Sequence, residues 1–115
     1  MTSTPITEGD LLWTPSQTVI ENANLTRYMA WLRSERGLDF ADYESLWQWS
    51  VSEIEAFWAS IWDYCGIVAS QSYSAVLAKR IMPGAHWFVD ARLNFAENIF
   101  SKRNSQRPAL LYRSE

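Results

Sequence analysis

The sequence contains too little cysteine, histidine and glycine for several common kinds of functional site. A single cysteine, Cys65, excludes a disulfide within the chain and fits a reducing compartment. The single histidine, His86, leaves zinc sites built from cysteine and histidine out of reach, because they need three or four such ligands. The four glycines are isolated, so neither a P-loop nor a dinucleotide-binding fingerprint can be written. We therefore expect no metal site and no cofactor site in these 115 residues.

Basic charge and long apolar runs are also scarce. Ten lysines and arginines stand against 13 aspartates and glutamates, and the net charge is -3, whereas binding to phosphates needs a cluster of basic side chains. We interpret the one basic cluster, Lys102, Arg103 and Arg107, as a solvated loop. No run of about 18 apolar residues occurs, and the N-terminus lacks a signal peptide's basic start and apolar core. We expect no nucleic-acid partner, no membrane association and a cytoplasmic location.

Aromatic residues, in contrast, are abundant, with seven tryptophans, five tyrosines and five phenylalanines. Each such ring buries about 150–250 Å² when it packs. A chain that folds as one small domain has difficulty hiding all of them in its own core. We therefore expect some of these rings to face a partner.

The local patterns predict a mainly α fold, α+β at most. Residues 1–23 show no sustained period and contain Pro5 and Pro15, which predicts an extended lead-in. A helix is predicted from Leu25 to Arg36, with Asn24 as its N-cap and Gly37 at its end, and Leu38 can fold back towards its last turn. Four residues form its apolar stripe: Leu25, Tyr28, Met29 and Leu32.

Two further helix starts are predicted in the middle of the chain. Ser50 and Glu53 have the spacing of a capping box, which predicts a helix that ends at Gly66. Asp42 is a candidate cap for a short helical turn over residues 43–49. On the later helix, one face carries Ile54, Phe57, Trp58, Ile61 and Cys65, and the opposite face carries Glu53, Ala56, Ser60 and Asp63.

The remaining pattern is weaker. Residues 73–77 favour a strand or extended segment, residues 82–85 a turn, and residues 94–100 a short helix. Pro108 precedes a strand-like apolar run, Ala109 to Tyr112, for which the chain offers no second convincing strand. Since an isolated strand leaves its backbone groups unpaired, we expect its partner strand to lie beyond residue 115.

No pattern of catalytic residues is found. Cys65 falls on an apolar helix face, where an inert thiol is usual, and we interpret His86 as a packing or hydrogen-bonding residue. The acidic pairs, such as Asp39 with Asp42, are explained as helix caps and first-turn charges. We expect no catalytic residue in this chain.

Several strings, taken in order, resemble the N-terminal region of the acetyl-CoA synthetase group of adenylate-forming ligases. Within that group the acetoacetyl-CoA synthetases are the most similar subfamily, mainly through Leu93 to Asn98. The match is collinear from about residue 11. The strings are Leu12-Trp13-Thr14-Pro15, Asp42 to Val51, Phe57-Trp58, Pro83 to Phe88, and Leu93-Asn94-Phe95-Ala96-Glu97-Asn98.

The resemblance implies a two-step ligase in which ATP activates acetoacetate as an adenylate and CoA then displaces AMP. ATP, Mg²⁺ and CoA are implied for the full-length enzyme, whose phosphate loop, ribose-binding motif and catalytic lysine have no counterpart here. Residues 24–106 would be the N-terminal helical region and residues 107–115 the truncated start of the adenylation domain.

The implied partner is the remainder of the ligase, against which this segment would act as a structural cap. An acetyl- or propionyl-CoA synthetase segment, and a standalone helical protein-interaction module, remain alternatives. The candidate docking residues are Trp13, Trp47, Trp49, Trp58, Trp62, Trp87, Phe88, Asn94 and Asn98.

Overall fold

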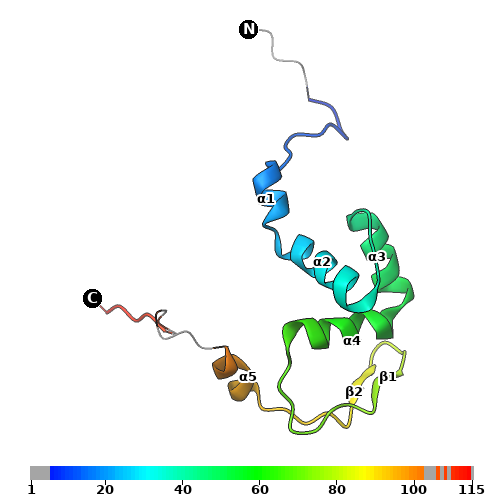
Figure 1. The fold of residues 1–115 in the computed structure, drawn as a ribbon, viewed down its shortest axis with the longest axis vertical. Helices are drawn as coiled ribbons and strands as arrows, with labels where there is room; N and C mark the ends of the chain where they lie inside the picture. Colours follow the sequence, from blue (N-terminus) through cyan, green and yellow to red (C-terminus); the bar gives the residue numbers. More distant parts are fainter. Residues whose placement is uncertain (1–5, 103–105, 107, 109, 115) are drawn as a thin grey trace. The chain divides into compact units, whose positions relative to one another are not determined.

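A computed structural model describes residues 6–102, 106, 108 and 110–114 (Figure 1). The described residues form five helices and two strands, in the order α1, α2, α3, α4, β1, β2 and α5. The mainly helical class predicted from the sequence is confirmed. The chain divides into two compact units, residues 1–41 and residues 42–115. No helix among the described residues is long and apolar enough to cross a lipid bilayer.

The first unit contains α1 (Gln17–Glu21) and α2 (Asn24–Arg36). Tyr28 and Leu32, two members of the predicted stripe, are the buried residues of α2. Gly37 follows the helix with φ of 65°, and the N–H of Leu38 donates to the carbonyl of Leu32 at 3.2 Å. The predicted helix and its glycine end are therefore confirmed.

The short helix α1 corrects the predicted lead-in. Residues 6–16 are not helical, but Gln17–Glu21 form one helical turn. On its exposed side, the Gln17 side-chain amide donates to the Glu21 carboxylate at 2.9 Å. Pro15 does not prevent this turn because it precedes the N-cap, Ser16, where a missing N–H costs nothing. Pro5 lies outside the described residues.

The second unit begins with α3 (Tyr43–Ser52), whose start is fixed by Asp42. The N–H of Ser45 donates to the Asp42 carboxylate at 2.8 Å, and the N–H of Asp42 donates to the Ser45 hydroxyl at 3.3 Å. This reciprocal pair satisfies two backbone donors that a helix start leaves free. Asp42 is therefore confirmed as a cap.

The capping box predicted at Ser50 and Glu53 is wrong. Ser50 lies inside α3, and its hydroxyl donates back to the carbonyl of Trp47 at 2.8 Å. Once α3 has started at Asp42, its propagation holds Ser50 in the helical conformation, where a serine bonds its own preceding turn. Glu53 alone separates α3 from α4 (Ile54–Cys65), and its side chain makes no capping bond.

Two residues of helix α4 depart from the predicted pair of faces. Ser60, assigned to the face opposite the apolar one, is only 2% exposed, whereas Trp58, assigned to the apolar face, is 40% exposed. The Ser60 hydroxyl donates to the carbonyl of Phe57 at 2.6 Å, so this small polar side chain is buried with its hydrogen bond made. The predicted glycine end is confirmed, since Gly66 has φ of 60° and the Ile67 N–H donates to the Trp62 carbonyl.

The unit continues with an antiparallel hairpin of β1 (Ala75–Lys79) and β2 (His86–Val89). Ala75 pairs with Val89 and Leu77 with Trp87, and an irregularity follows before Lys79 pairs with His86. The sequence predicted an extended segment near β1 but missed β2, a four-residue strand that becomes stable only by pairing. The chain therefore does offer a second strand, contrary to expectation.

Helix α5 (Phe95–Ser101) confirms the predicted short helix, with Asn94 as its cap. The expected C-terminal strand is not formed by its described residues, since residues 110–112 carry no strand and are 88–92% exposed. Ala109 lies outside the described residues. Without a neighbour to pair with, a short apolar run has no hydrogen-bonding partner that would hold it extended.

The capping bond of Asp42 predicts a pH-dependent stability. The Ser45 N–H, and next the Ser45 hydroxyl, hold the pKa of Asp42 below its ordinary value of 3.8. Because the folded pKa is the lower one, the contribution to the free energy of unfolding is complete above the unfolded pKa and is lost as pH falls through the folded pKa.

We expect Asp42→Ala to lower the urea midpoint at neutral pH, and Asp42→Asn, which caps without titrating, to preserve most of it. Urea titrations between about pH 6 and about pH 2 measure the effect. The wild type should lose more stability on acidification than Asp42→Asn, and an identical loss in the two proteins would show that the bond does not stabilise α3.

Gly66 predicts a backbone effect at the end of α4. A left-handed conformation costs an L-residue about 1–2 kcal/mol. Replacing glycine by alanine also lowers the conformational entropy of the unfolded chain, which stabilises the folded state by about 0.4–1 kcal/mol. A Cβ at Gly66 would meet no atom within 4 Å, so a steric clash adds nothing to the expected change in the free energy of unfolding. We expect Gly66→Ala to reduce the free energy of unfolding by about 1 kcal/mol in urea titrations. The matched variant Gly66→Asn should lose less, because asparagine tolerates this conformation, and equal losses would contradict the account.

Candidate functional site

A series of aromatic rings runs from the corner between α3 and α4 to the hairpin. Trp49 meets Phe57 edge-on with 5.8 Å between ring centroids, and Phe57 meets Trp58 at 5.4 Å. Trp58 then meets Trp87 of β2 at 5.7 Å with an interplanar angle of 67°. These are the edge-to-face distances at which aromatic pairs attract beyond their area burial. The rings therefore join α4 to the hairpin.

A second group of rings lies further along the same elements. The ring centroid of Trp62 in α4 lies 4.9 Å from that of Phe88 and 5.2 Å from that of Tyr73. The ring centroids of Tyr73 and Phe88 are 5.3 Å apart. Phe88 has φ of 45°, a conformation that costs a bulky residue about 1–3 kcal/mol. Aromatic pairs contribute about 0.5–1.5 kcal/mol each, so the contacts with Trp62 and Tyr73 are of the size needed to hold Phe88 there.

The predicted docking aromatics divide into two groups by this geometry. The five that pack on rings of the second unit are Trp49, Trp58, Trp62, Trp87 and Phe88. Trp47, also in the second unit, is 43% exposed, and Trp13 in the first unit is 73% exposed. Trp58 and Trp87 keep about two-fifths of their surface exposed, at 40% and 39%. A docking role for these residues remains a prediction, and internal packing is their observed contact.

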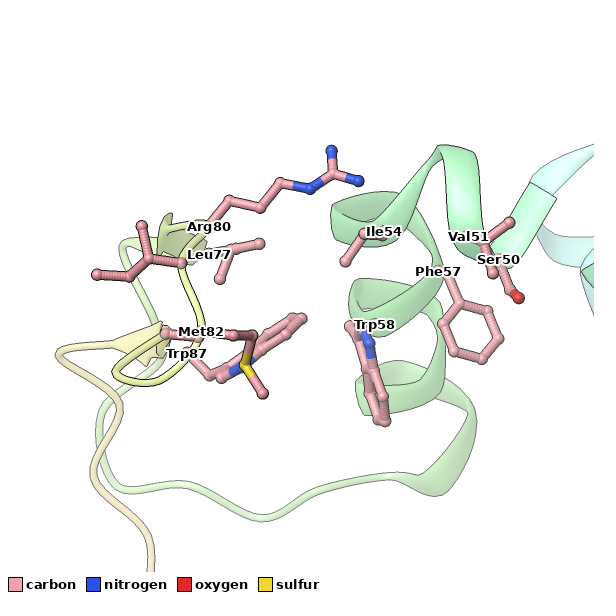
Figure 2. A pocket seen from close by; sticks show the side chains of 11 residues that line it. Ser50, Val51, Ile54, Phe57, Trp58, Leu77, Arg80, Met82 and Trp87 are labelled. Carbon is pink, nitrogen blue, oxygen red and sulfur yellow. The ribbon is translucent and has the colours of Figure 1, made fainter. Parts of the chain in front are cut away.

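An apolar groove of about 490 Å³ opens between α4 and the hairpin. Figure 2 shows Met82 and Trp87 on the hairpin side, facing Trp58 and Ile54 on α4, with the Arg80 side chain reaching across the rim. The lining includes Phe57 and Leu77 but neither of the two residues weighed as a nucleophile and base, Cys65 and His86. Its chemistry suits apolar contact rather than proton transfer.

The two predicted asparagines both bond to backbone of their own unit. The side-chain Oδ1 of Asn94 accepts from the N–H groups of Ala96 and Glu97, at 2.9 and 3.3 Å. The side-chain amide of Asn98 makes two hydrogen bonds to the backbone of Val68. Its oxygen accepts from the Val68 N–H and its NH₂ group donates to the Val68 carbonyl, at 2.8 Å each. The i, i+4 spacing places both asparagines on one side at the start of α5, but no signal in the sequence identifies Val68 as the partner of Asn98.

The two residues weighed for catalysis lie on different elements. Cys65, a free thiol, is half-buried as the last residue of α4, and His86 is exposed as the first residue of β2. The described residues give no hydrogen bond between these side chains. In the same part of the chain, no group of three or more His, Cys, Asp or Glu is placed to hold a metal ion.

Comparisons with known proteins give the chain its relatives. Residues 43–99 match the family described as acetyl-coenzyme A synthetase N-terminus. The chain is 36% identical over 104 residues to an acetoacetyl-coenzyme A synthetase of Rhizobium meliloti (strain 1021), covering 90% of this chain and 16% of the relative. It is 37% identical over 115 residues to the acetoacetyl-CoA synthetase of Danio rerio, covering 98% of this chain and 17% of the relative.

A solved structure agrees with the sequence matches. The acetoacetyl-CoA synthetase from Streptomyces lividans superimposes with a TM-score of 0.69 at 39% identity, covering 75% of this chain and 14% of that chain. The chain thus spans only 16–17% of the length of the curated relatives it matches. Residues 43–99 of the chain thus match the acetyl-coenzyme A synthetase N-terminus family, and 90–98% of the chain is similar to acetoacetyl-CoA synthetases.

Proposed function

We propose that this chain is the N-terminal structural segment of an ATP-dependent acetoacetyl-CoA synthetase. The observation that carries the proposal is its identity of 36–37% to two acetoacetyl-CoA synthetases over 90–98% of this chain. The full-length enzyme would convert acetoacetate, ATP and CoA into acetoacetyl-CoA, AMP and pyrophosphate. Residues 24–106 would form its N-terminal helical region and residues 107–115 the first part of its adenylation domain.

The role we propose for the segment is to pack against the remainder of the ligase. Its groove is lined mainly by apolar side chains, and its ring contacts hold helix to hairpin. ATP, Mg²⁺ and CoA would be held by the remainder, which makes up more than four-fifths of the length of the relatives. A cytoplasmic location is part of the proposal, and the single cysteine, Cys65, fits a reducing compartment.

A chimera tests this function. In the Streptomyces lividans enzyme, the region that matches this chain is replaced by the chain itself, and a second construction lacks the region altogether. We expect the chimera to form acetoacetyl-CoA and the deletion to be inactive, because the segment covers surface that the remainder needs buried. Release of AMP that depends on acetoacetate measures the reaction.

The same chimera separates a structural role from a role in substrate choice. If the segment only packs, the ratio of kcat/KM for acetoacetate to kcat/KM for acetate should match that of the parent enzyme within about twofold. A chimera no more active than the deletion would show that the chain is not an equivalent segment. A changed ratio would show that the segment takes part in selecting the acyl group.

A further inference from the structure

Helix α5 is amphipathic, and its apolar side is the exposed one. At 100° per residue, Phe95, Ala96, Ile99 and Phe100 fall on one side of the helix. On that side Phe95 is 78% exposed, Ile99 55% and Phe100 59%. Leu93, just before the helix, is 48% exposed. The surface helix of an independent domain normally has the reverse orientation, with its apolar stripe towards the core.

The polar side of α5 is the one that holds it to the second unit. Asn98 bonds both backbone groups of Val68, at 2.8 Å each, and also donates to the Asn94 carbonyl at 2.9 Å. Lys102, directly after the helix, donates to the carbonyl of Cys65 at the end of α4, where a cation is favoured. Asn98 and Lys102 thus bond to backbone groups of Val68 and Cys65. These bonds set the rotation of α5 about its axis, and this rotation directs Phe95 and Ile99 outwards.

The size of the exposed patch limits what can cover it. Interfaces between separate proteins use about 20–30 residues a side, far more than Leu93, Phe95, Ile99 and Phe100 supply. A partner joined through the same polypeptide has an effective concentration of about millimolar, so a small patch is enough to dock it. The curated relatives offer such a partner, since the matched region is only 16–17% of their length.

We propose that Leu93, Phe95, Ile99 and Phe100, here called the α5 face, form the docking face for the remainder of the ligase. The inference rests on the proposed function and specifies it, because it assigns the contact to α5 rather than to the tryptophans of α4 and the hairpin. The partner surface is apolar and carries no charge opposite the face. Asn94 and Asn98 act as positioning residues that present the face.

Hydrogen exchange of α5 tests the proposal in the chimera with the Streptomyces lividans enzyme and in this chain alone. The test variant is Phe95→Gln with Ile99→Gln, because glutamine is a good helix former and removes only the apolar contact. The matched control is Phe95→Leu with Ile99→Leu, which keeps the apolar character. In the chimera we expect the glutamine variant to lose at least about tenfold of the amide protection of α5 and the leucine variant to keep it. In the chain alone neither variant should change the protection.

Each contrary result has a distinct meaning. An active chimera whose α5 protection is unchanged in the glutamine variant overturns the α5 face and leaves the proposed function standing. Loss of protection by the glutamine variant in the chain alone shows that the face is internal and also overturns the proposal. A chimera no more active than the deletion removes the proposed function and the inference together. Sedimentation of the chain as a dimer that the glutamine variant dissociates assigns the face to a second copy instead.

Discussion

The contact between aromatic rings of α4 and rings of the hairpin is the interaction on which the second unit depends. Few side chains of this unit are buried, and among the described residues these are Leu46, Val76 and Ser60. A chain of this size buries a smaller share of its surface than a larger domain does. Large rings that meet edge to face, such as Trp58 with Trp87, therefore carry packing that a larger protein would assign to buried aliphatic residues.

This arrangement explains how the unit can hold together and still present apolar surface. The rings pack edge to face, so parts of Trp58 and Trp87 stay exposed and line the groove (Figure 2). Hydrogen bonds of Asn98 attach helix α5 to the rest of the unit, so its apolar side chains stay exposed. The proposed docking role requires this division, in which polar bonds fix the shape of the segment and apolar side chains remain for the contact.

Short-range signals in the sequence predicted the elements that depend on short-range physics. Gly37 ended α2, and Asp42 started α3, because a left-handed glycine and a capping carboxylate act within one turn of the chain. Ser50 misled for the same reason, since its spacing to Glu53 fits a cap equally well and only the helix already started at Asp42 decides between them.

Longer-range partners could not be predicted from the sequence. Strand β2 forms because Trp87 pairs with Leu77 across the hairpin, and a run of four residues carries little evidence of that pairing. Composition predicted that rings would be in excess but not which ones meet, so Trp62 and Phe88 were expected to face a partner and are found against each other. Asn98 was named for the resemblance alone, because its hydrogen-bonding partner, the backbone of Val68, lies thirty residues earlier.

A nuclear Overhauser spectrum of the isolated chain in solution tests the central claim most directly, namely that the rings pack inwards while α5 turns its apolar side out. The account predicts cross-peaks from Trp62 to Phe88 and Tyr73, and from Trp58 to Trp87, together with a slowly exchanging Asn98 side-chain amide. It predicts none from Phe95 or Ile99 beyond the helix they belong to. Cross-peaks from those two side chains to α4, with a rapidly exchanging Asn98 amide, would contradict it.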